Sequence, residues 1–159
     1  MQLLRSQERL KLLPMTTRAI PASEAATQET SKPLRISLVV AQGLLGLAFG
    51  FAGVMKTTQP IAELAAKMVW PGAVPEALVR FIGASEFLGA LGLVLPSLTR
   101  IKPGLTPLAA AGLVVIMLLA SLFHVARGEL FALPINFALG AIAAFIAWGR
   151  YRKAPIQAR

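Results

Sequence analysis

Five polar residues of this chain lie in or beside long apolar segments, where their chemistry is unusual: Lys56, Arg80, Glu86, His124 and Asn136. A carboxylate in the middle of an apolar segment is costly to bury, so Glu86 must be paired, hydrogen-bonded or protonated. Such a group can exchange protons or bind a polar head group, although a paired structural glutamate is the plainer alternative. Glu86 is therefore the first candidate for chemistry.

The other four residues each have a structural and a functional interpretation. Lys56 either extends its amine to the membrane interface or supplies a counter-charge for Glu86. Arg80 suits a contact with interfacial phosphate groups, or an electrostatic role beside Glu86. A single histidine cannot build a zinc site alone, so His124 is either an interfacial residue or a group that exchanges protons or contacts a ligand. Asn136 either hydrogen-bonds a neighbouring helix or binds a ligand head group.

Four apolar segments position these residues, and each is long enough to cross a membrane. With about 19–21 residues, a helix spans a hydrocarbon layer of roughly 30 Å. A backbone in lipid must satisfy its own hydrogen bonds, so each segment should be helical. The segments are Ile36–Met55, Ala77–Leu95, Leu105–Val125 and Leu130–Trp148. We therefore predict an all-α fold, an integral membrane, antiparallel four-helix bundle.

Composition supports a membrane protein and excludes several kinds of chemistry. The 159 residues are 56% hydrophobic and only 14% charged, with a mean hydropathy of +0.68. The net charge of +9 flanks the apolar segments, which favours contact with membrane lipids and predicts no nucleic-acid binding. The chain has no cysteine and one histidine, so thiolate metal sites, iron–sulfur ligation and bis-histidine haem within one chain are excluded. We predict no metal site and no covalent cofactor.

The chain divides into three parts: a flexible basic N-terminal tail (1–33), a four-helix transmembrane domain (34–150) and a basic C-terminal tail (151–159). Within the first tail, Met1–Leu13 has the composition of a short amphipathic surface helix, and Ala22–Pro33 is polar enough to be disordered. Met15 is an alternative initiator.

The connections carry further local signals. In the longest one, Ile61–Trp70 fits a short amphipathic helix whose tryptophan would anchor at the interface, and Pro71–Pro75 predicts a turn. The second apolar segment is expected to end at Pro96. The short connection Ala126–Glu129 makes the third and fourth segments antiparallel neighbours. In the first segment, the Gly46-x-x-x-Gly50 pair is predicted to face a neighbouring helix.

Alternating directions place the candidate residues toward one membrane face, with Glu86 deepest. This pattern predicts a one-sided polar pocket, since a channel needs polar groups along its length. Of the 16 lysines and arginines, all but Lys56, Lys67, Arg80 and Arg127 lie on the side of the termini. The excess predicts that both termini are cytoplasmic.

The ordered pattern resembles the DoxX-like family of small four-helix membrane proteins, over about Ala41–Trp148. It comprises Gly53-x-x-Lys56, Pro75, Arg80-x-x-Gly83-x-x-Glu86-x-x-Gly89, Pro96, His124 and Pro134-x-Asn136. Some members are named as subunits of quinol oxidase or thiosulfate:quinone oxidoreductase systems, and others associate with soluble oxidoreductases. The resemblance implies a bacterial inner-membrane subunit that binds a quinone while a partner carries electrons.

These observations predict a membrane subunit that binds a small amphiphile, a quinone or a lipid, and serves an oxidoreductase assembly. Glu86 and His124 would be the catalytic, proton-exchanging groups, and Lys56, Arg80 and Asn136 would bind the ligand. A self-sufficient enzyme is not expected. Two alternatives stay open: a small proton-coupled transporter that uses Glu86 and His124, and a structural or chaperone-like subunit without a ligand.

Overall fold

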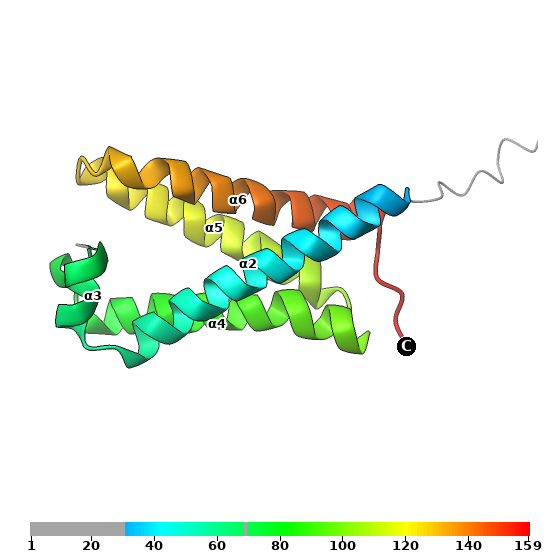
Figure 1. The fold of residues 1–159 in the computed structure, drawn as a ribbon, viewed down its shortest axis with the longest axis horizontal. Coiled ribbons are helices and arrows are strands. Elements are labelled where there is room, and N and C mark those ends of the chain that lie inside the picture. Colours follow the sequence, from blue (N-terminus) through cyan, green and yellow to red (C-terminus); the bar gives the residue numbers. More distant parts are fainter. Residues whose placement is uncertain (1–30, 69) are drawn as a thin grey trace, which may run out of the picture.

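The computed structural model describes residues 31–68 and 70–159, and every regular element in that part of the chain is a helix (Figure 1). The five α-helices are α2 (Lys32–Thr58), α3 (Ile61–Met68), α4 (Glu76–Thr99), α5 (Leu105–Ala126) and α6 (Leu133–Trp148). The short elements are the 3-10 turns η1 (Trp70–Ala73) and η2 (Leu130–Ala132) and the π-helical turn η3 (Gly149–Lys153). The predicted surface helix Met1–Leu13, the alternative initiator Met15 and the polar stretch up to residue 30 lie outside the described residues.

Four helical spans are long and apolar enough to cross a membrane, which confirms the all-α membrane prediction. They are Lys32–Thr58, Glu76–Thr99, Leu105–Ala126 and Leu130–Lys153, the last of which joins η2, α6 and η3. Their outward side chains are large and apolar; Leu47, Phe81 and Leu122 are each exposed by more than half. In a bilayer these side chains face acyl chains rather than water.

The four long helices alternate in direction and form one bundle (Figure 1). α2 packs mainly on α4, α5 packs on α6, and contacts between α4 and α5 join the two pairs. The start of α2 and the end of the chain lie at one end of the bundle, which we call the terminal end. α3 lies at the opposite end, which we call the α3 end.

Small residues allow α2 and α4 to approach closely. Gly46 and Gly50 both face α4, as predicted: a Cβ on Gly46 would lie 2.7 Å from Val94 Cγ2, and one on Gly50 would lie 3.7 Å from Ala90 Cβ. The tightest backbone approach between these helices is one turn further along, at Gly53. A Cβ on Gly53 would lie 2.7 Å from the carbonyl oxygen of Gly83.

The helix boundaries differ from expectation in two places. α4 runs through Pro96 to Thr99, so the expected end at Pro96 is wrong. A proline removes a single helical N–H, and a membrane helix tolerates this loss when nearby groups compensate. The acceptor that Pro96 leaves without its helical donor is the carbonyl of Gly92, and the helix continues for three more residues until Arg100 closes it in the left-handed region with φ 60°. α2 begins at Lys32, two residues before the expected domain boundary.

The connections at the α3 end are compact. α3 is the predicted amphipathic helix, with Leu64 as its buried residue, and η1 follows it where a turn was predicted. Between α5 and η2, the chain reverses at Gly128, whose φ of 71° suits a residue without a Cβ. This tight reversal makes α5 and α6 antiparallel neighbours, as the sequence predicts.

Candidate functional site

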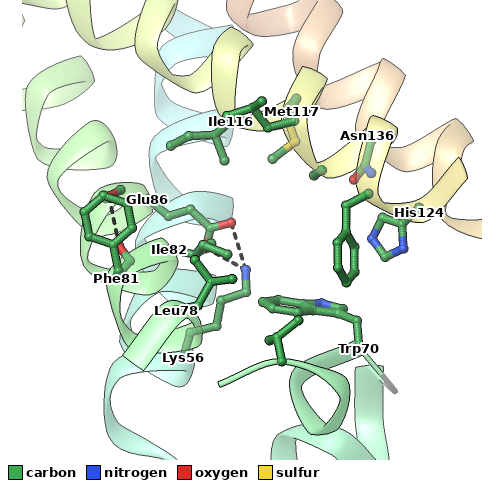
Figure 2. Close-up of a pocket in the computed structure, with 15 residues that line it drawn as sticks. Lys56, Trp70, Leu78, Phe81, Ile82, Glu86, Ile116, Met117, His124 and Asn136 are labelled. Atoms are coloured by element: carbon green, nitrogen blue, oxygen red, sulfur yellow. Dashed lines mark hydrogen bonds and ion pairs between the residues drawn. The ribbon is translucent and has the colours of Figure 1, made fainter. Parts of the chain in front are cut away.

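A cavity of about 340 Å³ lies at the α3 end, and residues of all four long helices and of η1 contribute to its walls. Figure 2 shows its labelled side chains around a common space. Most of the wall is apolar and comes from α4 and α5, for example Leu78, Ile82, Ile116 and Met117. The polar lining residues are Lys56, Ser85, Glu86, His124 and Asn136. Four of the five predicted site residues therefore share one cavity.

Lys56 and Glu86 form a buried ion pair on the cavity wall. Lys56 Nζ lies 2.8 Å from Oε1 and 2.6 Å from Oε2 of Glu86, and the two side chains are only 9% and 4% exposed. The prediction that Glu86 points into the bundle toward one of the other polar residues is confirmed. Of the three N–H bonds of an ammonium group, the two carboxylate oxygens occupy two. A cavity ligand can accept the third.

The glycine contact between α2 and α4 positions this pair. A Cβ on Gly83 would lie 2.6 Å from Lys56 Cβ, so the lysine stem passes directly over that glycine. Gly53 is one turn before Lys56 and lies against the same stretch of α4. The close approach brings a side chain from the last turn of α2 to a carboxylate deep in α4.

Arg80 does not line the cavity; its side chain bonds the end of α2 and Glu76. Its Nη1 donates hydrogen bonds of 2.7 Å to the carbonyl oxygens of Lys56 and Gln59, and its Nε and Nη2 bond Glu76. These carbonyls belong to the C-terminal end of α2, where helical acceptors lack intrahelical donors. The structure therefore does not bring Arg80 beside Glu86; it makes Arg80 the residue that fixes the backbone of Lys56.

An aromatic row connects the ion pair with His124. Lys56 Nζ lies 5.9 Å from the centroid of the Trp70 ring, which packs edge-on against Phe123 at 6.3 Å. Phe123 in turn packs edge-on against His124 at 5.6 Å. The sequence suggested Trp70 only as an interfacial anchor. Its role as a cavity wall depends on η1, which folds the connection back over the bundle.

Asn136 lies across the cavity from Glu86, on the first turns of α6 (Figure 2). The residue is 9% exposed, and its Nδ2 has no hydrogen-bond partner among the described residues. Leaving a buried donor unpaired costs about 1–3 kcal/mol. A ligand that accepts a hydrogen bond at this position would remove the cost.

His124 is held by a carboxylate that sequence reasoning missed. His124 Nδ1 lies 2.7 Å from Glu129 Oε2, and Arg127 Nε donates to Glu129 Oε1, also at 2.7 Å. His124 and Glu129 are five positions apart, which is not a helical spacing, and only the reversal at Gly128 brings them together. The ring is thus oriented from one nitrogen while His124 lines the cavity.

This cluster predicts a pH dependence of stability. The hydrogen bond from Arg127, and to a smaller extent the one from His124, holds the pKa of Glu129 below its ordinary value of 4.5. Because the folded pKa lies below the unfolded one, the stabilisation is complete above pH 4.5 and is lost as the pH falls through the lowered pKa. The melting temperature in detergent should therefore fall in acid less steeply for Glu129→Gln than for the wild type. Glu63→Gln, an exposed carboxylate on α3, is the control and should titrate like the wild type.

Fold and cavity together define the class: a small integral membrane protein with four spanning helices and a one-sided polar cavity. The model of the DoxX-like family matches residues 40–146, and the chain belongs to this family. The match contains all five predicted site residues and confirms the resemblance. No curated protein and no solved structure matches the chain.

Proposed function

We propose that this DoxX-like membrane protein binds a small amphiphile of the quinone class in the cavity at the α3 end, as a subunit of an oxidoreductase assembly. One observation carries the proposal. A buried ammonium–carboxylate pair and an unpaired amide donor face each other across a cavity whose wall is mostly apolar. Such a mixture of apolar wall and few convergent polar groups is typical of small-molecule sites.

The rim of the cavity supports entry from the bilayer. Leu78, Phe81 and Leu119 line the cavity, yet they are 44%, 68% and 61% exposed on the outer surface of α4 and α5. In a membrane these side chains contact acyl chains. A ligand that already partitions into lipid can thus reach the cavity between the two helices without crossing water.

The donor groups fit a quinone head group. A quinone ring carries two carbonyl acceptors and an apolar tail, and it supplies redox chemistry of two electrons and two protons when bound. Asn136 Nδ2 and Lys56 Nζ would each donate to one carbonyl, while Trp70 packs on the ring. Glu86 would accept and release a proton at its carboxylate beside the head group, and His124 would exchange protons near the α3 end. With no cysteine and one histidine in the chain, a partner protein would carry the electrons.

The opposite half of the bundle favours binding over transport. A packed apolar cluster that includes Leu45, Phe49, Leu93 and Leu113 lies further along the bundle. A transporter needs a polar path or a movable gate through such a cluster. Met117 belongs both to this cluster and to the cavity wall, so the cavity ends against packed apolar side chains, as a binding site does.

Loss of ligand binding tests the proposal. The chain has two tryptophans, so a Trp148→Phe background leaves Trp70 as the reporter within the cavity. Titration with a short-chain ubiquinone should quench its fluorescence saturably. Asn136→Leu and Glu86→Gln should weaken binding by about tenfold or more, since each removes a polar contact worth about 1–3 kcal/mol.

Ser85→Ala is the matched control, because Ser85 lines the cavity but its hydroxyl donates to the Phe81 carbonyl of its own helix. Unsaturable quenching, or equal binding by all variants, would contradict the quinone site. Such a result would favour a subunit without a ligand.

We also propose a bacterial inner-membrane location with both termini in the cytoplasm. In the described residues, the basic side chains concentrate at the terminal end, which supports this orientation by the positive-inside rule. Because the chain lacks cysteine, single introduced cysteines report topology directly. Thr99→Cys and Gln157→Cys should react with an impermeant maleimide only in inverted vesicles, and Ala73→Cys only in intact spheroplasts. Labelling of all three from one side would contradict the topology.

A further inference from the structure

Charge is strongly segregated along the bundle. Four glutamates are the acidic side chains of the described residues: Glu63, Glu76, Glu86 and Glu129. All of them belong to the α3 end or to the cavity beside it. The terminal end carries a set of basic residues without a side-chain carboxylate in the described part of the chain: Lys32, Arg35, Arg100, Lys102, Arg150, Arg152, Lys153 and Arg159.

Three of these arginines converge on a second pocket of about 310 Å³. Arg35 comes from the first turn of α2, Arg100 ends α4, and Arg150 belongs to η3. Val39, Ser97 and the C-terminal segment 154–157 complete the lining. Guanidinium groups repel one another, so their convergence is most stable when an anion lies among them.

Arg150 is the fixed member of the three. It is only 8% exposed, and its Nε donates to Gln42 Oε1 at 2.6 Å. Gln42 is itself oriented by a 2.9 Å hydrogen bond from its Nε2 to the carbonyl of Leu93. A guanidinium has five N–H donors in a planar fork that matches phosphate geometry, so donors remain for an anion in the pocket.

The C-terminal segment closes the pocket from outside the bundle. After η3, Ala154 is buried and receives a 3.4 Å hydrogen bond from Arg150 Nη1 at its carbonyl oxygen. The backbone N–H of Arg159 donates to the Arg100 carbonyl at 3.2 Å. Figure 1 shows this segment turning away from α6 toward the end of α4. The fold therefore brings residues that are far apart in sequence to one pocket wall, which a scattered set of basic surface residues would not form.

We infer that this pocket binds a phosphate group, held by Arg35, Arg100 and Arg150, at the membrane face opposite the quinone cavity. The pocket lies where a phospholipid head group would lie, so an anionic phospholipid and a free phosphate are the two sources of the same chemistry. The inference stands independently of the proposed quinone site.

Two charge-matched double variants test the inference in the full chain. Arg35→Gln with Arg100→Asn removes two charges from the pocket; asparagine suits the left-handed φ of residue 100. Lys102→Asn with Arg152→Gln removes two charges from the same end outside the pocket. Arg150 stays unchanged in both, because its hydrogen bond to Gln42 also supports the fold.

Native mass spectrometry from detergent measures the binding of phosphatidylglycerol, with zwitterionic phosphatidylcholine as the comparison lipid. A thermal-shift assay measures whether inorganic phosphate stabilises the protein. The pocket double variant should bind phosphatidylglycerol about 25-fold more weakly, at about fivefold for each guanidinium that contacts the phosphate directly through charge-assisted hydrogen bonds. The control double variant should change it by less than about threefold.

The outcomes separate the sources. Stabilisation by inorganic phosphate that the pocket double variant abolishes identifies a free-phosphate site. If the wild-type protein binds phosphatidylglycerol but is not stabilised by inorganic phosphate, the pocket is a lipid site. Equal losses in the two double variants would show diffuse attraction of anions and overturn the inference, as would equal binding of phosphatidylcholine or no binding at all.

Discussion

Lys56→Met should lower the free energy of unfolding by about 3–5 kcal/mol, because it leaves the Glu86 carboxylate buried without its partner. Both side chains are almost completely buried, and Lys56 Nζ contacts both carboxylate oxygens. Glu86→Leu alone should be similarly harmful. The double variant Lys56→Met with Glu86→Leu should recover most of the loss, since an apolar pair often replaces a buried ion pair at little cost.

The double variant separates folding from function. It should melt near the wild-type temperature in detergent, yet it should no longer quench Trp70 with a short-chain ubiquinone. Lys67→Met, on the exposed side of α3, controls for the loss of a lysine at the same end and should change stability by no more than about 0.5 kcal/mol. A Lys56→Met protein as stable as this control would show that the ion pair contributes nothing to the fold.

Gly53→Ala should have the second largest effect. The added methyl group would lie 2.7 Å from the carbonyl oxygen of Gly83 and from the backbone nitrogen of Phe87. Backbone atoms of a helix cannot move aside alone, so α2 and α4 must separate, at a cost of about 1–3 kcal/mol. The separation would also pull Lys56 from Glu86 and weaken ligand binding.

Two glycines of the same helix serve as controls. A Cβ on Gly43 meets nothing within 4 Å, and one on Gly50 meets Ala90 Cβ at an ordinary 3.7 Å. Gly43→Ala and Gly50→Ala should therefore be neutral or slightly stabilising, because alanine favours a helix by up to about 1 kcal/mol over glycine. Thermal unfolding of the three variants in one detergent measures the difference. Equal melting temperatures would mean that the Gly53 contact is looser than the structure shows.

The predictable features of this protein depend on local composition and on helix depth. Spanning length and apolarity identify the four long helices, and alternating direction brings Lys56, Glu86, His124 and Asn136 to one end. The groups that a side chain faces around its helix axis were not predictable in the same way. Arg80 shares that depth, but its side chain bonds the end of α2 rather than the cavity. At about 100° per residue, Arg80 lies about 120° around the helix from Glu86, but that angle alone does not say which groups its side chain contacts.

Residues placed by turns were harder to foresee. Glu129 reaches His124 only through the reversal at Gly128, and Trp70 enters the cavity wall only through η1. The count of basic residues places Arg150 only on the side of the termini, whereas the structure buries it against Gln42. Its long side chain lets a residue at the end of a span reach inward, which a count of interfacial charges does not reveal.

The contact between Gln42 and Arg150 also bears on biosynthesis. It joins the first long helix to the turn after the last one, across 108 positions of sequence, whereas the extensive α2–α4 and α5–α6 contacts form between segments made earlier or close together. The α2–α4 and α5–α6 pairs can assemble while the chain is still being inserted, but the hydrogen bond between Gln42 and Arg150 can form only after η3 has left the ribosome. Late closure would give the insertion machinery a partly open bundle, and a bulky fusion directly after residue 154 would disturb the last step of assembly rather than the earlier ones.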